Sequence, residues 1–316
     1  MWVLLYACSP SPEQPSSGSP AYGEVLSDTL IGDVNDIVAD TRRIFLCGED
    51  GVRVYDSGDP YNPTLYQSYY VSDPCYTADI LNNRVLLGSR DAFRSYAPNN
   101  MLVRGEYFPS FAVQALDVSA GGTLAWLAGT DEDGQVWLEE VVYREDAAMQ
   151  SLSLQAIDAA TPVALSALPD GLMLLDADGV LHLFSAALER VSQWSSDAPG
   201  SDLFMATGDS AHAYISLGSG GMAIVDVGDL FAPNLASIWP DDDGATYDVL
   251  LVGSALYIGR PDAVRVLDVS SPEAPAPIGA EDIDLLGTPT RMWVDNRYAY
   301  LADAGNGILS IVNLED

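Results

Sequence analysis

Four aspartates in this sequence share a local pattern that could hold a cation. Each is followed by a short apolar run typical of a β-strand, and the four are Asp36, Asp79, Asp117 and Asp248. Carboxylate oxygens are ligands that Ca²⁺ prefers, and carboxylates brought to one level repel unless a cation or protons neutralise them. The sequence therefore predicts a metal site if the fold brings these positions together. The alternative is that each carboxylate caps its own local turn.

Three arginines and two histidines complete the set of side chains that could do chemistry. Arg43, Arg84 and Arg297 each precede the second strand of a unit, and we expect them on the same rim as the aspartates, as local counter-charges. His182 and His212 lie within alternating strand patterns, without the H-E-x-x-H, C-x-x-C or G-x-S-x-G contexts of metal sites and nucleophiles. No residue is assigned a catalytic role, and a non-enzymatic protein is favoured over an enzyme.

Two further motifs resemble ligand-binding loops only in composition. Residues 218–223 satisfy G-x-G-x-x-A, but the chain continues as a strand rather than as the helix that a dinucleotide site requires. We therefore expect a hairpin turn there. The acidic runs at 131–134 and 241–244 lack the alternating spacing of an EF-hand loop, which indicates solvated turns.

The elements that must position these side chains are clearest at residues 291–314. This stretch predicts three short strands over 292–294, 298–301 and 308–312, separated by Asn- and Gly-containing turns. Asn and Gly accept positive φ, which tight hairpin turns require. Three strands joined in this way form most of one small antiparallel sheet.

A similar sequence motif of short strands and turns recurs along the chain. A strand ends in an aspartate before a Pro-containing turn at Asp56, Asp226 and Asp268, and the last two lie 42 residues apart. There we expect the carboxylate to accept hydrogen bonds from the following turn. Weaker copies of the strand lie at 92–97, 135–140 and 179–185, and Asn313 holds the place of the aspartate in the final copy. The chain therefore has seven units.

A fourth strand completes each unit after the prolines, as at 64–68, 235–239 and 277–279, and the third unit has longer strands at 136–143 and 149–156. Four-stranded units of about 40–45 residues are the signature of a β-propeller, in which each blade covers its neighbour. We predict an all-β, seven-bladed β-propeller over residues 22–316. Residues 22–30 should supply the outer strand of the last blade and close the ring.

Composition agrees with this fold and restricts the partners. Hydrophobic residues make up 48 % of the chain, enough for a large core, and 27 Gly with 19 Pro suit many short strands and turns. The 46 acidic residues against 13 basic ones give a net charge of −33, which repels phosphate backbones and anionic lipids. Nucleic acid is therefore not expected as a partner.

Several of these motifs resemble the repeats of the bacterial LVIVD-repeat proteins. The resemblance is carried by the strands at 222–226, 298–303 and 308–313 and by the turns at 59–63 and 271–275, which are similar to the family's Asp-Pro-x-x-Pro turn. It covers the first, fifth, sixth and seventh units. The family implies a periplasmic or surface β-propeller, often a lipoprotein, and it brings no catalytic residues because its motif is a folding motif.

Residues 1–8 resemble the end of a bacterial lipoprotein signal. Residues 5–8 (LYAC) match the pattern in which Cys8 is acylated, and the Ser/Pro-rich residues 9–21 would act as a tether. The apolar run before Cys8 is only about six residues, shorter than a usual signal. Either the true start lies upstream of Met1, or this is a terminal segment with an unrelated cysteine. The lipoprotein interpretation predicts an exported monomer in the cell envelope, on the periplasmic or surface side of the outer membrane, attached to it only by this anchor.

Cys47 and Cys75 are placed by the predicted topology at the seam between the first two blades. Four antiparallel strands return the chain to the face it left, so both positions emerge on the same face. A disulfide across the seam and two buried free thiols are both consistent with the sequence.

Two functions from different classes fit these observations. The first is a non-enzymatic scaffold, without a cofactor, that binds a protein or glycan of the envelope. The observation that supports it is a concentration of tyrosines in the first two blades, which could stack on sugars or pack against a partner. These are Tyr66, Tyr69, Tyr70, Tyr76 and Tyr107. The second is a cation-dependent hydrolase or lactonase, in which the four aspartates hold Ca²⁺ at the axial channel.

Lipidation of Cys8 predicts a membrane-bound protein. Expression with export in a bacterial host should place the wild type in the membrane fraction, and Cys8→Ser should move it to the soluble fraction, because the acyl chains supply the anchor. Fractionation followed by immunoblotting measures this. A wild-type protein that stays fully soluble with its leader intact would contradict the prediction.

Overall fold

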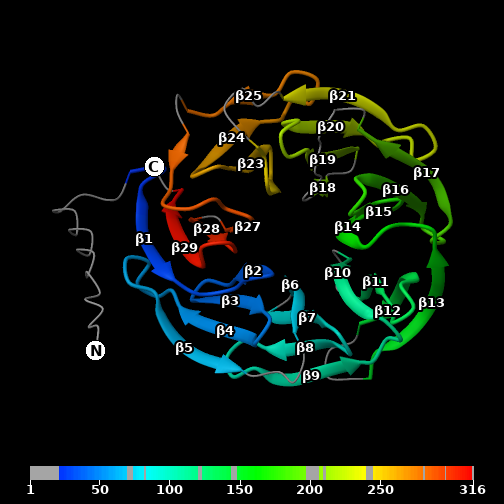
Figure 1. The fold of residues 1–316 in the computed structure, drawn as a ribbon, viewed down its shortest axis with the longest axis horizontal. Helices are drawn as coiled ribbons and strands as arrows, with labels where there is room; N and C mark the ends of the chain where they lie inside the picture. The colour runs from blue at the N-terminus through cyan, green and yellow to red at the C-terminus, as the bar shows by residue number, and fades with distance from the viewer. Residues whose placement is uncertain are drawn as a thin grey trace, which may run out of the picture.

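The chain folds into a closed ring of small antiparallel sheets (Figure 1). The computed structural model describes residues 21–69, 74–81, 83–119, 123–143, 148–196, 206–208, 211–239, 245–279, 282–295 and 297–314. Regular structure in these residues is entirely β-strand, and the strands make seven sheets. The predicted seven-bladed β-propeller is confirmed.

The innermost strand of each blade faces the axis of the ring (Figure 1). These strands are β2 (Asp36–Ala39), β6 (Cys75–Leu81), β10 (Ala112–Val118), β14 (Pro162–Leu168), β18 (Ala206–Gly208), β22 (Val249–Val252) and β27 (Arg291–Val294). The second strands are β3 (Arg43–Gly48), β7 (Arg84–Ser89), β11 (Leu124–Thr130), β15 (Gly171–Asp176), β19 (His212–Ser216), β23 (Ala255–Arg260) and β28 (Tyr298–Asp303).

The third and outer strands complete the blades away from the axis. The third strands are β4 (Gly51–Asp56), β8 (Phe93–Ala97), β12 (Val136–Val142), β16 (Val180–Ser185), β20 (Met222–Asp226), β24 (Ala263–Asp268) and β29 (Ile308–Asn313). The outer strands are β5 (Thr64–Tyr69), β9 (Leu102–Tyr107), β13 (Gln150–Ile157), β17 (Arg190–Ser195), β21 (Asn234–Trp239), β25 (Ala276–Pro277) with β26 (Ile283–Asp284), and β1 (Val25–Leu30).

The core lies between the blades rather than inside one of them. Within the described residues, the buried apolar side chains form seven clusters, and each cluster combines side chains of two neighbouring blades. At the seam between the last and first blades, for example, Tyr300 and Ile311 pack with Ile37 and Leu46. Each sheet is apolar on both faces, so it can be buried only by a neighbour on each side.

The strand-end aspartates act as predicted. Asp56 accepts a hydrogen bond from the amide of Gly58 at 2.8 Å, Asp226 from Gly228 at 2.9 Å, and Asp268 from Ser270 at 2.9 Å. Each bond closes the turn two residues after the carboxylate. The repeated aspartate is therefore a feature of the turn, which explains its regular return along the sequence.

The sixth blade departs from the expected outer strand at 277–279. Its outer edge is split into β25, which pairs with Leu267 and Asp268, and β26, which pairs with Ala263 and Val264. Proline lacks an amide hydrogen, so the prolines at 275 and 277 limit how far the first piece can continue along β24.

A disulfide joins the first two blades. Cys47 in β3 and Cys75 at the start of β6 are bonded, at a sequence separation of 28. Of the two alternatives that the sequence left open, this is the bridged one. Cross-linking a loop of this size lowers the entropy of the unfolded chain by an amount worth about 3.6 kcal/mol.

The ring is closed by the N-terminal strand. β1 lies antiparallel to β29, with Val25 opposite Val312 and Leu30 opposite Ile308 (Figure 1). The amide of Gly23 donates to the carbonyl of Asn313 at 2.7 Å, and the amide of Asn313 donates to the carbonyl of Glu24 at 2.9 Å. The expected closure is therefore present.

Removing the closing strand should destabilise the whole ring. Deletion of residues 1–30 exposes the edge of β29 and removes the buried Leu26, which alone contributes about 2 kcal/mol. We expect a thermal midpoint several degrees lower than that of the full chain, whereas deletion of residues 1–20 should leave it unchanged. Differential scanning calorimetry of both truncations decides, and equal midpoints would reject the closure.

Candidate functional site

The four predicted aspartates all lie at the inner edge of their blades. Asp36, Asp79 and Asp117 belong to β2, β6 and β10, and Asp248 directly precedes β22. Each carboxylate accepts a hydrogen bond from the amide of the next residue in its own strand, at distances of 2.6–2.9 Å. This local bond explains why an aspartate before an apolar residue recurs at this position.

Most of these carboxylates also join two blades. Asp36 accepts from the amide of Ala78 at 2.7 Å and from the Thr77 hydroxyl at 3.2 Å, both in the second blade. Asp117 accepts from the amide of Ala167 in the fourth blade at 2.5 Å. Asp248 is bonded in the same way to the backbone of Met292 in the seventh blade. A bond from the next blade satisfies the second oxygen and ties neighbouring inner strands together.

Asp79 breaks this pattern. Its bond within the strand comes from Ile80 at 2.6 Å, and no described amide of the third blade donates to it. Its second oxygen is left at the wall of a cavity. Sequence patterns alone do not distinguish Asp79 from the other three, because the difference lies in the neighbouring strand.

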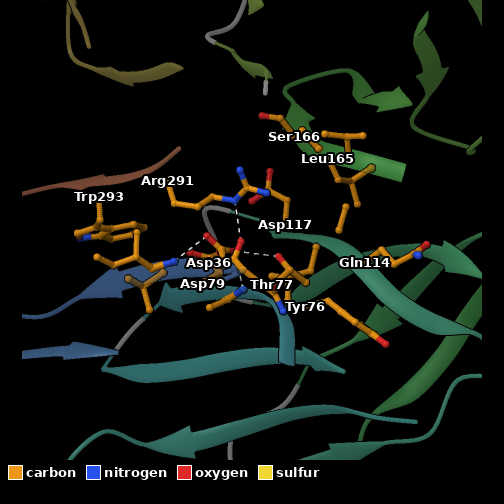
Figure 2. A pocket seen from close by; sticks show the side chains of 18 of the residues that line it. Asp36, Tyr76, Thr77, Asp79, Gln114, Asp117, Leu165, Ser166, Arg291 and Trp293 are labelled. Atoms are coloured by element: carbon orange, nitrogen blue, oxygen red, sulfur yellow. Dashed lines mark hydrogen bonds between the residues drawn. The ribbon is translucent and has the colours of Figure 1, made fainter. Parts of the chain in front are cut away.

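The axial end of the inner strands encloses a cavity of about 240 Å³ (Figure 2). Its wall combines polar, charged and aromatic side chains: Asp36, Tyr76, Thr77, Asp79, Gln114, Asp117, Ser166, Arg291 and Trp293. Asp248, which is only 3 % exposed, is not part of this wall. Three of the four predicted aspartates therefore meet at one site.

Burial makes these carboxylates hard to ionise. It raises the pKa of Asp79 to about 7, with a further contribution from the nearby charge of Asp117. Burial likewise raises the pKa of Asp117 to about 6 and that of Asp248 to about 7. The pKa of Asp36 is also raised by burial, against the opposing effect of Arg291. Part of this group is therefore protonated near neutral pH.

Arg291 is the cation of the site, and the sequence did not single it out. Its Nε donates to the carbonyl of Asn35 at 2.6 Å and its Nη1 to the carbonyl of Thr290 at 2.6 Å. Its charge lowers the pKa of Asp36 and of Asp248. The available clue was its position as the first residue of an inner strand, where the other blades carry no cation.

The three arginines expected as counter-charges do not line the cavity. Arg43 lies over the ring of Tyr66 at 4.8 Å, and Arg297 lies over the ring of Tyr298 at 5.4 Å. Arg84 donates to the carbonyl of Asn83 at 3.3 Å. These arginines lie at or directly before the start of second strands, as the sequence indicated. The cavity is lined by inner strands instead.

The predicted tyrosines do not form one surface. Tyr76 lines the cavity, Tyr69 packs at the seam of the first two blades, and Tyr66 is 52 % exposed on β5. Tyr107 donates to the carboxylate of Glu139, and burial and this bond raise its pKa to about 12. Tyr70 lies outside the described residues, as does Cys8. Of the described members of this set, only Tyr76 lines the axial cavity.

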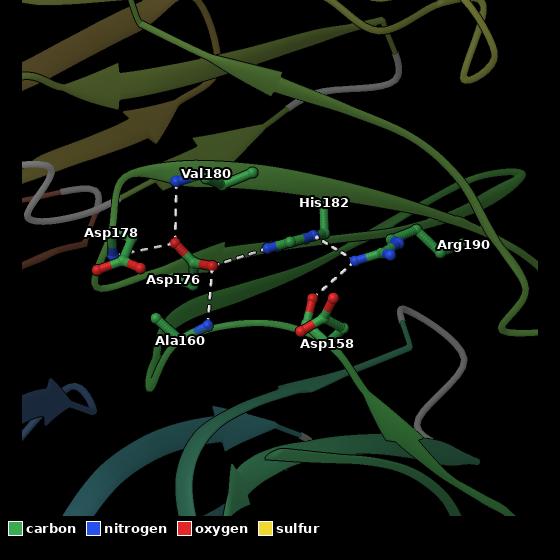
Figure 3. A network of polar contacts seen from close by, with 7 residues as sticks. All are labelled: Asp158, Ala160, Asp176, Asp178, Val180, His182 and Arg190. Carbon is green, nitrogen blue, oxygen red and sulfur yellow. Dashed lines mark hydrogen bonds and ion pairs between the residues drawn. The ribbon is translucent and has the colours of Figure 1, made fainter. Parts of the chain in front are cut away.

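His182 belongs to a buried network in the fourth blade (Figure 3). Its Nε2 is 2.8 Å from Asp176, and Arg190 lies 3.4 Å from its Nδ1 while also donating to the carbonyl of Asp158 at 2.7 Å. Because arginine can only donate, Nδ1 accepts and the proton lies on Nε2. Burial alone would raise the pKa of Asp176, but bonds from His182 and from backbone amides hold it below its usual value. The network holds β15 to β16.

Two of the remaining motifs are turns. Residues 218–221 join β19 to β20, with positive φ at Gly218 and Gly221 and a bond from the amide of Gly221 to the carbonyl of Gly218 at 3.2 Å. Asp131 closes its turn by accepting from the amides of Asp133 and Gln135. The acidic run at 241–244 lies outside the described residues.

The described residues contain no group of three or more His, Cys, Asp or Glu side chains arranged to hold a metal ion. In the axial cavity, the carboxylates of Asp36 and Asp117 are engaged by backbone amides of two blades. The four-aspartate metal site therefore stays a prediction, and no reaction step is assigned to it. No helix in the described part of the chain is long and apolar enough to cross a membrane.

A family model for the LVIVD repeat matches residues 210–240 and 287–313, in the fifth and seventh blades. The chain carries LVIVD repeats. A comparison with curated proteins finds no match. Among solved structures, the chain is similar to the WD40 β-propeller domain of Doa1, with 12 % identity, a TM-score of 0.70 and coverage of 93 % of this chain and 97 % of that one.

A second similar structure is a computationally designed protein, Ika8, with 10 % identity and a TM-score of 0.61. The alignment covers 89 % of this chain and 96 % of the designed one. Identities this low show a shared propeller fold and nothing about function.

The raised pKa of Asp79 predicts a pH-dependent stability. The folded state holds the proton more tightly than the unfolded chain, so this contribution is full below pH 4 and is lost as the pH rises through 7. Asp79→Asn keeps the bond from Ile80 without the charge. It should therefore stabilise the protein at pH 8 by about 1–4 kcal/mol and have no effect at pH 4.

Chemical denaturation of wild type and variant at pH 4, 6 and 8 measures this difference. The matched control is Asp50→Asn, which removes an exposed carboxylate from the turn between β3 and β4 and should have no such pH dependence. A stability difference for Asp79→Asn that is the same at pH 4 and pH 8 would refute the assignment.

Proposed function

We propose that the chain is a non-enzymatic β-propeller of a bacterial cell envelope and acts as a binding scaffold, with its axial cavity as the site for the end of a glycan. The observation that carries this proposal is the composition of the cavity wall. Two aromatic side chains, Tyr76 and Trp293, stand there with the carboxylates and with Gln114. Sites for small polar ligands commonly combine aromatic surfaces with a few placed hydrogen-bonding groups.

A sugar ring suits such a wall better than a protein surface does. The ring offers C–H groups to an aromatic face and hydroxyl donors to carboxylates and amides. A volume of about 240 Å³ lies below the range of about 300–1,000 Å³ for drug-sized ligands, so it takes one small group. A protein partner would need a much larger contact, of at least about 1,000 Å². Such a partner would have to use a broader surface than the cavity.

Two observations support the envelope setting. The bond between Cys47 and Cys75 suits an oxidising, exported compartment. The lipobox-like residues 5–8 and the Ser/Pro-rich residues 9–21 would anchor and space the propeller from a membrane. The protein would act as a monomer and touch the membrane only through that anchor, because the net charge of −33 repels anionic lipids.

Glycan binding at the cavity can be tested with an array of bacterial envelope saccharides. We expect binding by the wild type and a loss of about fivefold to tenfold for Tyr76→Ala, because stacking on a ring contributes about 1 kcal/mol. Phe108→Ala is the matched control, since Phe108 is 61 % exposed and lies outside the cavity. Binding that is equally strong in both variants, or no bound saccharide at all, would reject the proposal.

The second candidate is a cation-dependent hydrolase or lactonase. It is favoured by one observation, the convergence of carboxylates with raised pKa values near the axis, since such groups gather at functional sites. The bonds from neighbouring blades to Asp36 and Asp117 favour a structural role instead.

Calcium addition separates these candidates. If three or more of the carboxylates bind Ca²⁺, adding it to chelator-treated protein should raise the melting temperature, because a ligand of the folded state stabilises it. Asp79→Asn, which removes a carboxylate from the cavity wall, should abolish that rise. Thermal shift and elemental analysis measure the effect, and no response to Ca²⁺ or Mg²⁺ together with no bound metal would remove the hydrolase candidate.

A further inference from the structure

The charges around the axial cavity are unevenly distributed. Arg291 acts on Asp36 and Asp248, whose pKa values it lowers. The charge that acts most on Asp79 is instead that of Asp117, which raises its pKa. The wall formed by β6 and β10 therefore carries two neighbouring carboxylates without a matching cation, while the wall formed by β27 has one.

Asp79 also has a carboxylate oxygen that accepts no hydrogen bond from a described residue. The second oxygens of Asp36 and Asp117 take an amide hydrogen from the next blade, at 2.7 Å and 2.5 Å. Asp79 takes only the amide of Ile80 among the described residues, and its side chain lines the cavity (Figure 2). The second oxygen of Asp79 is therefore available to a donor that enters the cavity.

We propose that the cavity selects a ligand with a positively charged amino group, and that this group binds between Asp79 and Asp117. This inference rests on the proposed function, in which the ligand is the end of a glycan. The ligand class is therefore an amino sugar with a free amine, as opposed to its N-acetylated form.

The chemistry of an ammonium group fits the described wall. It is compact and carries three donors, which match the open oxygen of Asp79 and the carboxylate of Asp117. Tyr76 lies in the same strand as Asp79 and lines the same cavity, where its ring can contact the sugar that carries the amine. Acetylation removes the charge and adds bulk, and an anionic ligand is repelled by the net charge of −33.

Binding should release a proton from the carboxylate group. Asp79 and Asp117 are partly protonated below pH 7, and an ammonium group binds their ionised forms. The charged and titratable groups that face this position from the packed strands are Asp36, Asp117, Tyr76 and Arg291, with Asp248 buried nearby. Affinity for the amine should therefore rise between pH 5 and pH 7.

Two trisaccharides with one backbone test the proposal: the β-1,4-linked trimer of glucosamine and the same trimer fully N-acetylated. Isothermal titration calorimetry at pH 7 and about 0.15 M salt should show that the free amine binds at least tenfold more tightly. A hydrogen bond to a charged group changes an affinity by about tenfold or more. Asp79→Asn should lower the affinity for the amine about tenfold and leave the acetylated trimer unaffected. Asp50→Asn, which removes the same charge from the surface, should change neither.

The outcomes separate the two proposals. Equal affinity for both trisaccharides, with loss in Tyr76→Ala, would overturn selection for the amine and leave glycan binding at the cavity in place. No binding of either trisaccharide would overturn both. Equal losses in Asp79→Asn and Asp50→Asn would mean attraction by the overall charge and would also overturn the site, provided that circular dichroism shows both variants folded.

Discussion

No blade of this protein can bury its own apolar faces, and the rest of the structure depends on that constraint. Each four-stranded sheet is too thin to have an interior, so its side chains become buried only when a neighbour packs on either side. The seven apolar clusters lie at the seams, and the ring makes every blade an inner one. The seventh blade has only three strands from its own stretch of sequence, β27, β28 and β29. The pairing of β1 with β29 supplies its outer strand.

The same constraint brings polar chemistry to the axis. Packing the blades side by side places seven inner strands around a narrow space, where backbone amides of one strand face the side chains of the next. Asp36 and Asp117 use that proximity to join neighbouring blades. Asp79, in the same type of position, lacks this bond and therefore lines a cavity with an acceptor available. The open acceptor in this cavity thus results from the absence of one contact between blades, among the described residues.

Much of the fold could be predicted because its determinants are local. The turn bonds of Asp56, Asp226 and Asp268 span two residues, so each leaves a trace in the sequence, and their spacing gives the blade length. The inner position of the four aspartates followed from the same spacing. The bonds across seams, the approach of Arg291 to Asp36 and the scatter of the tyrosines depend on contacts between blades, which one sequence does not reveal. The split outer strand of the sixth blade was missed because short Pro-containing segments carry little strand pattern.

The closing pair also sets an order on assembly. Val25 is among the first propeller residues made, but its partner Val312 is among the last. The ring must therefore wait as an open row of blades, whose two end faces are apolar, until the last strands have been made. Contacts between residues so far apart in the sequence slow folding. The apolar end faces that are still uncovered favour aggregation until the ring closes. The bridge from Cys47 to Cys75, which spans a short segment, can lock the first two blades together during that wait. Closure, which pairs Val25 with Val312, can come only after the last strands have been made.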